Sequence, residues 1–492
     1  MIERCRLRGN KLQAAAVSFS LLGESGDPTA GHTGAVVAEV AEPIETTVSL
    51  LGEPSGNLVC LIASHFGTSV DDASWILQTA AAKELGIEPW QVLAASSHNH
   101  SVPLLARHSL SGYEDPEIIR NRLEMAPLGE RFLKELRTAL RGLRNRMQPV
   151  TVEWGVGHER RISYYRKGRR QDGSTYFIRE EDRLLLGADY SGDIDDEAPV
   201  VCLRGSDGQM VTALTQFTAH PVTAYHAEHL IACGEWPQTA VEIVSRKMGN
   251  VNPVPVSFLQ GCAGDVNSRE MFCGGVERSR QFGRLLGETY LSTLSKLSPS
   301  SRSDWQFAVA SADVPLAELP APALLESELA EMDDFVRRAK AGDEGALNCV
   351  GLNFPRALSP AYRARLVELI RPWNHWALQR HADGSLSDLP RSLPLDVHVL
   401  RLGDVAIVGY PTEPFQNIGR KLRRASPLPL TIPCGYINSA TGFIGYVPDS
   451  ENVGDREYMS AFYRYTRYIA PFRKPAGDTL VTKAVEMLTA GL

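Results

Sequence analysis

Two histidines separated by a single residue follow a short apolar run in this sequence. The run is Val92–Ser96, and the histidines are His98 and His100. In an extended chain the side chains of residues i and i+2 point to the same side, so both imidazoles can face one site. Neutral imidazole is a common zinc ligand, and histidine is the commonest general acid or base. Two solvated loop histidines remain the alternative for this pattern taken alone.

A third histidine, His220, ends another apolar stretch, Val211–Ala219, and precedes Pro221. Proline keeps the preceding residue extended and interrupts strand pairing, which leaves the His220 side chain at a sheet edge. Alone, this pattern fits a satisfied core histidine as well as a ligand. His226 and His229 could compete as ligands. Their segment has no clear helical pattern, so they rank below His220.

Two carboxylates also stand where apolar runs end. Asp265 follows the run Val256–Gln260 and a loop bracketed by two glycines, where backbone N–H groups and a cation could both reach it. A structural glycine turn is the alternative. Glu413 follows the run Asp404–Val408 and lies in a turn between two prolines.

The elements that must position these residues are short apolar runs that alternate with helical segments. Such alternation indicates βαβ units. We therefore predict an α/β fold: one large mixed, mostly parallel sheet flanked by helices, with its ligand crevice where the strands end. The expected strands are Ala14–Phe19, Asn57–Ala63, Val92–Ser96, Val211–Ala219, Val256–Gln260, Pro394–Leu402 and Asp404–Val408, and the expected helices are Asp71–Leu85, Glu130–Met147, Arg278–Leu297 and Thr479–Leu492.

Residues 315–391 differ from the rest of the chain. They contain proline clusters and two predicted helices, Leu324–Ala341 and Pro360–Gln379, before strand signals resume at Pro394. We expect a helical insertion or lid over 315–391, set into a catalytic domain made of residues 1–314 and 392–492.

Taken together and in order, these motifs resemble the neutral (non-lysosomal) ceramidase family. The likeness runs from about Leu12 to the C-terminus. The motifs that carry it are His98-Asn99-His100-Ser101-Val102-Pro103, Ala219-His220-Pro221, Gly264-Asp265-Val266, Pro411-Thr412-Glu413-Pro414 and Phe443-Ile444-Gly445-Tyr446-Val447-Pro448, with Glu84-Leu85-Gly86-Ile87 and Val92-Leu93-Ala94-Ala95 before them.

The resemblance implies one catalytic Zn²⁺ per chain. Carried over by motif, its ligands would be His98, His220, Glu413 and Tyr446. Zinc binds imidazole and carboxylate readily, whereas tyrosine is an uncommon ligand. Phe443 in the same loop cannot bind a metal, so Tyr446 is the candidate from that loop.

The resemblance also implies catalytic roles for four other residues. His100 would be the general acid or base, Arg166 would lie near the substrate, and Tyr458 would stabilise a developing oxyanion. Asp265 completes this catalytic set. A surface charge and a packed aromatic remain the alternatives for Arg166 and Tyr458.

The chain departs from the family in two respects. Ceramidases have a Ser-Asn pair before the Gly-Asp-Val loop, where this sequence has Gly261-Cys262, so a residue often assigned to the reaction is missing. They also carry a C-terminal immunoglobulin-like domain, which we do not expect here. The departures leave the substrate open between ceramide and something smaller or more polar.

Composition excludes several classes of protein. The chain has 492 residues, 43% of them hydrophobic and 22% charged, which excludes a disordered chain or a coiled coil. A net charge of −7 gives no positive field for nucleic acid, and no apolar run is long enough to span a membrane. The partner we expect is a small-molecule or lipid-like substrate. The oligomeric state stays open.

Eight cysteines without a C-x-x-C pair fit reduced thiols in a cytoplasmic protein. The basic residues before Leu12–Leu22 imitate a signal peptide, so secretion is the alternative; Gln13, Ser18 and Ser20 dilute that stretch. Motifs of serine esterases, NTPases, nicotinamide dehydrogenases and zincin proteases are absent from the sequence.

The function we predict is zinc-dependent hydrolysis of an amide (N-acyl) bond by metal-activated water. The alternatives are a zinc hydrolase of an ester, lactone or sugar derivative, and a binding protein that has lost its catalytic function.

Overall fold

The computed structural model describes residues 5–29, 36–67, 73–107, 124–249, 252–438, 445–465 and 468–490. Two large sheets form its centre. The first is nine-stranded, in the order β16-β14-β13-β9-β2-β4-β5-β6, with β18 paired to β9 off this path. Its strands are β2 Gln13–Leu21, β4 Ile44–Gly52, β5 Leu58–Ser64, β6 Val92–Ser96, β9 Gln148–His158, β13 Glu197–Gly205, β14 Met210–Phe217, β16 Val256–Gln260 and β18 Ser298–Pro299.

The second sheet has five strands in the order β1-β19-β22-β23-β25. They are β1 Cys5–Gly9, β19 Trp305–Pro315, β22 Ser392–Leu402, β23 Val405–Gly409 and β25 Leu430–Cys434. All its pairs are antiparallel except β23 with β25.

The two sheets pack face to face through one apolar layer. Alternate residues enter it: Val59 and Leu61 of β5 meet Val405 and Ile407 of β23 in one cluster. The residues between them, such as Cys60 of β5, face helices on the outer side. β5 is therefore buried on both faces.

The prediction of one mostly parallel sheet is wrong. The described residues form two large sheets, and within these only β14–β16, β5–β6 and β23–β25 are parallel. A strand buried on both faces has a continuous apolar sequence whether its neighbours are parallel or antiparallel. The continuous runs were interpreted as parallel strands, although the pattern does not distinguish the two cases.

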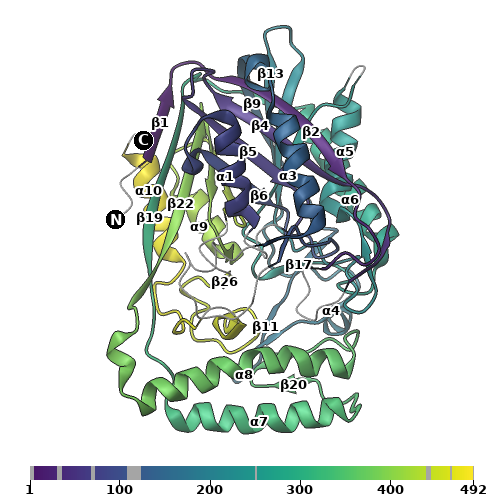
Figure 1. Ribbon diagram of the computed structural model, residues 1–492, viewed down its shortest axis with the longest axis vertical. Helices are drawn as coiled ribbons and strands as arrows, with labels where there is room; N and C mark the ends of the chain where they lie inside the picture. Colours follow the sequence, from purple (N-terminus) through teal and green to yellow (C-terminus); the bar gives the residue numbers. More distant parts are fainter. Residues whose placement is uncertain are drawn as a thin grey trace.

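Helices cover the outer faces of both sheets (Figure 1). α1 and α3 pack on β4, β5 and β6; α5 and α6 pack on β13, β14 and β16; α9 and α10 pack on the five-stranded sheet. Their bounds are α1 Ala73–Leu85, α3 Pro127–Leu140, α5 Glu235–Met248, α6 Gly275–Leu294, α9 Gln416–Ala425 and α10 Asp478–Thr489. The helix expected to reach Met147 ends at Leu140 because Gly142 adopts φ +70°.

The segment between β19 and β22 forms a helical hairpin, α7 Pro322–Lys340 and α8 Pro360–Ala382, which runs across one end of the molecule (Figure 1). The two helices expected at 324–341 and 360–379 are these two. No described helix combines the length and hydropathy that a membrane span requires.

Short elements complete the described chain. They are β3 Val37–Val40, β7 Ala106–Arg107, β8 Glu124–Met125, β10 Ser163–Tyr165, β11 Lys167–Arg169, β12 Thr175–Phe177, α4 Glu180–Leu186, β15 Leu230–Ala232, β17 Val266–Ser268, β20 Asn348–Cys349, β21 Leu352–Asn353, β24 Glu413–Pro414 and β26 Tyr446–Val447.

Candidate metal centre

The site lies where the three parallel strand pairs of the two large sheets end. Each pair is a strand–helix–strand unit, β5-α1-β6, β14-α5-β16 and β23-α9-β25. His98 follows β6, His220 follows β14, and Glu413 follows β23. The expectation of a crevice at strand ends is thus met locally by these three units.

The two sheets are tied together beside the site. The N–H of Ser96 donates to the carbonyl of Tyr436 at 3.1 Å, and the N–H of Tyr436 donates to Thr412 at 2.9 Å. Ser96 is two residues before His98, and Thr412 is one residue before Glu413. The backbone of Tyr436 therefore bridges the two sheets beside the site.

His98 and His220 converge on one carboxylate. Oε2 of Glu413 lies 3.1 Å from Nε2 of His98 and 3.0 Å from Nε2 of His220. All three side chains are at most 5% exposed. The His98 backbone has φ +60°, an unfavourable conformation for a histidine, and the Ser96 hydroxyl accepts its N–H at 2.9 Å.

The hydrogen bond of Nδ1 determines the tautomer of His220. Nδ1 lies 2.8 Å from the carbonyl oxygen of Ala263, which can only accept, so Nδ1 carries the proton. Burial, with Arg166 adding to it, lowers the pKa of His220 to about 3, so the ring is neutral. The lone pair of Nε2 thus points at the Glu413 carboxylate, an arrangement that a cation between them would stabilise.

Two further donors stand at the same point. The hydroxyl of Tyr446 lies 3.3 Å from Nε2 of His220, because β24 and β26 pair and bring Glu413 opposite Tyr446. Nε2 of His100 lies 3.2 Å from Nε2 of His98. His98, His100 and His220 form a group in which one ring nitrogen from each lies within 4.8 Å of the others.

The distances between these donor atoms fit a bound zinc ion. Ligands about 2.0–2.1 Å from a tetrahedral zinc lie roughly 3.3 Å from each other. The separations of His98 and His220 from Glu413, and of Tyr446 from His220, are 3.0–3.3 Å. The Nδ1 bond of His220 to a backbone carbonyl is the outer contact that metal-binding histidines usually make.

Arg166 is buried beside this centre. Its guanidinium donates to Oδ1 of Asn267 at 2.9 Å and to the carbonyl of Gly264 at 2.7 Å, and it lies 3.4 Å from Nε2 of His220. It also stacks 5.2 Å from the ring centre of Tyr446. Burial raises the pKa of the Tyr446 hydroxyl, and the Arg166 charge opposes that rise.

The remaining two predicted residues lie in different places. Tyr458 lines the cavity described below, with its ring 5.7 Å from that of Tyr446. Asp265 is fully buried and does not line the cavity; its Oδ1 accepts the N–H of Gln416 at the start of α9. In this position Asp265 supports the start of α9.

A cavity of about 130 Å³ adjoins the centre. The residues of the centre line part of it, and most of the remaining wall is apolar or aromatic. These wall residues are Phe177, Val222, Tyr225, Met271, Phe272, Leu352, Phe354, Pro355, Leu358, Tyr362, Leu366, Tyr458 and Phe462. Residues 352–366 come from the segment inserted between β19 and β22, so this segment forms one wall.

Sequence reasoning missed Tyr436 and most of the wall. The Tyr436 ring packs 4.5 Å from that of His98, its backbone has φ +59°, and it is 1% exposed. A tyrosine after a glycine at the end of a strand carries no chemical signal. The glycine that follows β25 was the only local cue to an unusual backbone.

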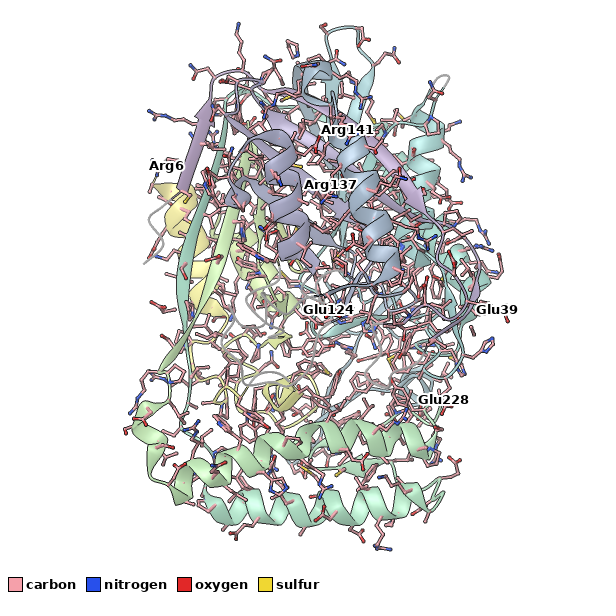
Figure 2. All side chains as sticks on the ribbon, viewed as in Figure 1. Arg6, Glu39, Glu124, Arg137, Arg141 and Glu228 are labelled. Atoms are coloured by element: carbon pink, nitrogen blue, oxygen red, sulfur yellow. The ribbon has the colours of Figure 1, made fainter. Side chains whose placement is uncertain are left out.

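Two other sequence features are resolved by position. His226 and His229 are exposed, and His229 lies 3.2 Å from Glu39, which is at the margin of the molecule in Figure 2. At Gly261 a Cβ would fall 2.1 Å from Nε2 of Gln216 and 2.2 Å from Oγ1 of Thr218. Phe443 and Ile444 lie outside the described residues.

No protein-family profile matches the sequence, and no curated protein matches it either. Solved structures do. Neutral ceramidase from Pseudomonas aeruginosa superposes with a TM-score of 0.59 at 15% identity, over 98% of this chain and 74% of that chain. The chain has the fold of neutral ceramidase.

A ceramidase complexed with C2 gives a TM-score of 0.60 at 15% identity, over 98% of this chain and 75% of that one. The resemblance stated from the sequence is thus confirmed in the fold. The ceramidase fold places His98, His220, Glu413 and Tyr446 together, although four separate segments supply them.

Proposed function

We propose that this protein is a zinc-dependent hydrolase that cleaves the amide bond of an amphiphilic N-acyl substrate. One observation carries the proposal: two imidazoles, a carboxylate and a phenol meet at 3.0–3.3 Å in the lining of a largely apolar cavity. The ceramidase fold supports the same reaction class.

His98, His220, Glu413 and Tyr446 would hold the metal. Bound there, zinc would lower the pKa of a water and polarise the scissile carbonyl. The Nδ1 contact of His220 keeps its Nε2 free of a proton, and the backbone bonds of Tyr436 hold the His98 and Glu413 segments together. The chain's own contribution is thus a preorganised set of donors.

His100 is placed to move the proton. It is the most exposed of the three histidines, it lines the cavity, and its Nε2 lies 3.2 Å from Nε2 of His98. It would take a proton from the attacking water and give it to the amide nitrogen as the C–N bond breaks, which yields a carboxylic acid and an amine. Arg166 and Tyr458 would stabilise the negative charge on the former carbonyl oxygen.

The cavity wall supports an amphiphilic substrate. Beyond the centre, the charged side chain among the described lining residues is Arg166, which already bonds to Asn267 and Gly264. A sugar or a charged peptide would leave its polar groups unpaired against Phe177, Phe272 and Phe354. An acyl chain or a sphingoid-like chain fits that wall.

The test is a hydrolysis panel of N-acyl sphingoid lipids, short N-acyl amines, esters and aryl glycosides. We expect amide cleavage by the wild type. His100→Ala should keep its zinc and lose roughly 10²–10⁴-fold in rate, as expected for a missing acid or base. His229→Ala, an exposed histidine, is the control. Cleavage of glycosides alone would overturn the reaction class, and loss of zinc in His100→Ala would make that residue a ligand.

A further inference from the structure

Three consecutive leucines protrude from the last turn of α4. Leu184, Leu185 and Leu186 are 54%, 87% and 51% exposed. The helix ends there, and Gly187 follows with φ +127°. Consecutive exposed apolar residues carry a cost in water and mark a contact surface. We call these three residues the leucine tip.

Residues at the N-terminal end of α4 form hydrogen bonds to segments that line the cavity. The Arg179 side chain donates to the carbonyl of Phe354 at 3.4 Å, and Glu181 accepts the N–H of Arg356 at 3.0 Å. Glu180 accepts the N–H of Glu270 at 3.0 Å, next to the wall residues Met271 and Phe272. Two wall segments thus hold α4, and its helix spans about 10 Å from them to the leucine tip.

The charges of α4 are paired within the helix. Arg183 binds Glu180 at 2.6 Å, and Arg179 binds Asp182 at 2.7 Å and Glu181 at 3.5 Å. The part of α4 next to the leucine tip therefore carries little net charge. Together with a chain charge of −7, this disfavours attraction to an anionic surface and suits a zwitterionic one.

The area of the leucine tip argues against a second copy of the chain as its partner. Three leucine side chains present on the order of a few hundred Å² at most. A stable protein interface buries roughly 800 Å² on each side. Such a small protrusion suits shallow insertion between lipid head groups, where apolar side chains enter the acyl boundary.

We propose that the leucine tip inserts into a zwitterionic lipid surface and brings the cavity to a substrate held in that surface. The proposal rests on the proposed function in one respect, namely that the substrate is an amphiphile. Binding itself requires no catalysis. The two proposals can therefore fail separately.

The test uses vesicles of phosphatidylcholine and the full chain. The triple variant Leu184→Ser/Leu185→Ser/Leu186→Ser should bind at least tenfold more weakly in co-sedimentation, and Leu185→Ser should lose part of that affinity. The matched control is Leu324→Ser/Leu386→Ser, two exposed leucines of the inserted segment at 40% and 38% exposure. The control should bind as the wild type does. A thermal melt checks that each variant is folded.

Catalysis gives an independent readout. The triple variant should hydrolyse a substrate embedded in vesicles at least tenfold more slowly and a short soluble N-acyl amine at the wild-type rate. Equal vesicle binding by wild type and triple variant would overturn the proposal. So would binding confined to anionic vesicles with steep salt dependence, or a dimer that the triple variant dissolves. Vesicle binding through the leucine tip without any amide cleavage would overturn the proposed function and leave this inference intact.

Discussion

Nε2 of His98 lies 3.1 Å from Oε2 of Glu413, although the two residues follow strands of different sheets. Nothing within either sheet fixes that distance. It depends on the packing of the two sheets and on the Tyr436 backbone, which bonds to Ser96 on one side and to Thr412 on the other. Disturbing the contact between the sheets should therefore disturb the metal centre before it disturbs the fold.

His98→Ala and His220→Ala should each abolish stoichiometric zinc binding. Each removes a nitrogen that approaches Glu413, and leaves the carboxylate buried without that partner. Metal analysis after mild dialysis measures the effect, with one zinc per chain in the wild type. His229→Ala should keep its zinc, because this histidine is exposed and pairs with Glu39. Full zinc content in both site variants would place the metal elsewhere.

Tyr436→Ala should weaken zinc binding by about 10–100-fold, the range seen when an outer contact of a metal ligand is lost. The Tyr436 ring supports His98 at 4.5 Å, whereas no described group bonds its hydroxyl. Tyr436→Phe should therefore bind zinc as the wild type does. Competition with a chromophoric chelator gives both affinities. Equal loss in the two variants would assign the effect to the hydroxyl instead of the ring.

Gly261→Ser should destabilise the protein by about 1–3 kcal/mol and should not raise its activity. The new Cβ would overlap Gln216 and Thr218, which are buried and bonded to each other, and overpacking of this kind has that cost. Denaturant unfolding measures the loss. A variant of unchanged stability and higher rate would show that a serine at this position can reach the substrate.

Glu235→Gln should stabilise the protein at pH 8 and have little effect near pH 4. Burial raises the pKa of Glu235 to about 7, whereas in the unfolded chain it is near its usual value of 4.5. Between these values the folded state holds the proton and the unfolded state does not, so stability falls as pH rises from about 4.5 to 7. A neutral glutamine removes that loss, worth about 1–3 kcal/mol at pH 8.

Unfolding in urea at the two pH values checks this prediction. Exposed Glu326 offers the control Glu326→Gln, which should show no such difference between the two pH values. A stability gain of equal size at both pH values would point to altered hydrogen bonding with Ala224 instead of titration.

The sequence located the strand ends well because an apolar run followed by a polar side chain is a local signal. His98, His220 and Glu413 all follow runs that are strands in the structure. Tyr446 came from the resemblance alone, and its place opposite Glu413 depends on the pairing of β24 with β26.

The number of sheets and the relative direction of their strands could not be predicted in the same way. Val59 and Cys60 are both fully buried, one against the second sheet and the other against helices, so no alternation marks the faces of β5. The residues of the cavity wall could not be predicted from the sequence either. Phe354 and Phe177 lie far apart in sequence, and only the folded chain shows that they share a wall.

The pairing of β19 with β22 continues to Pro315 opposite Ser392. The intervening 76 residues, 316–391, therefore leave and rejoin the sheet at a single point, while the four proposed metal ligands all lie outside them. Insertions, deletions or exchange within this stretch need not shift the strands that carry the chemistry. Related chains could thus acquire new substrates by replacing residues 316–391 alone. Grafting this stretch from another chain of the same fold would transfer the substrate selectivity of that chain.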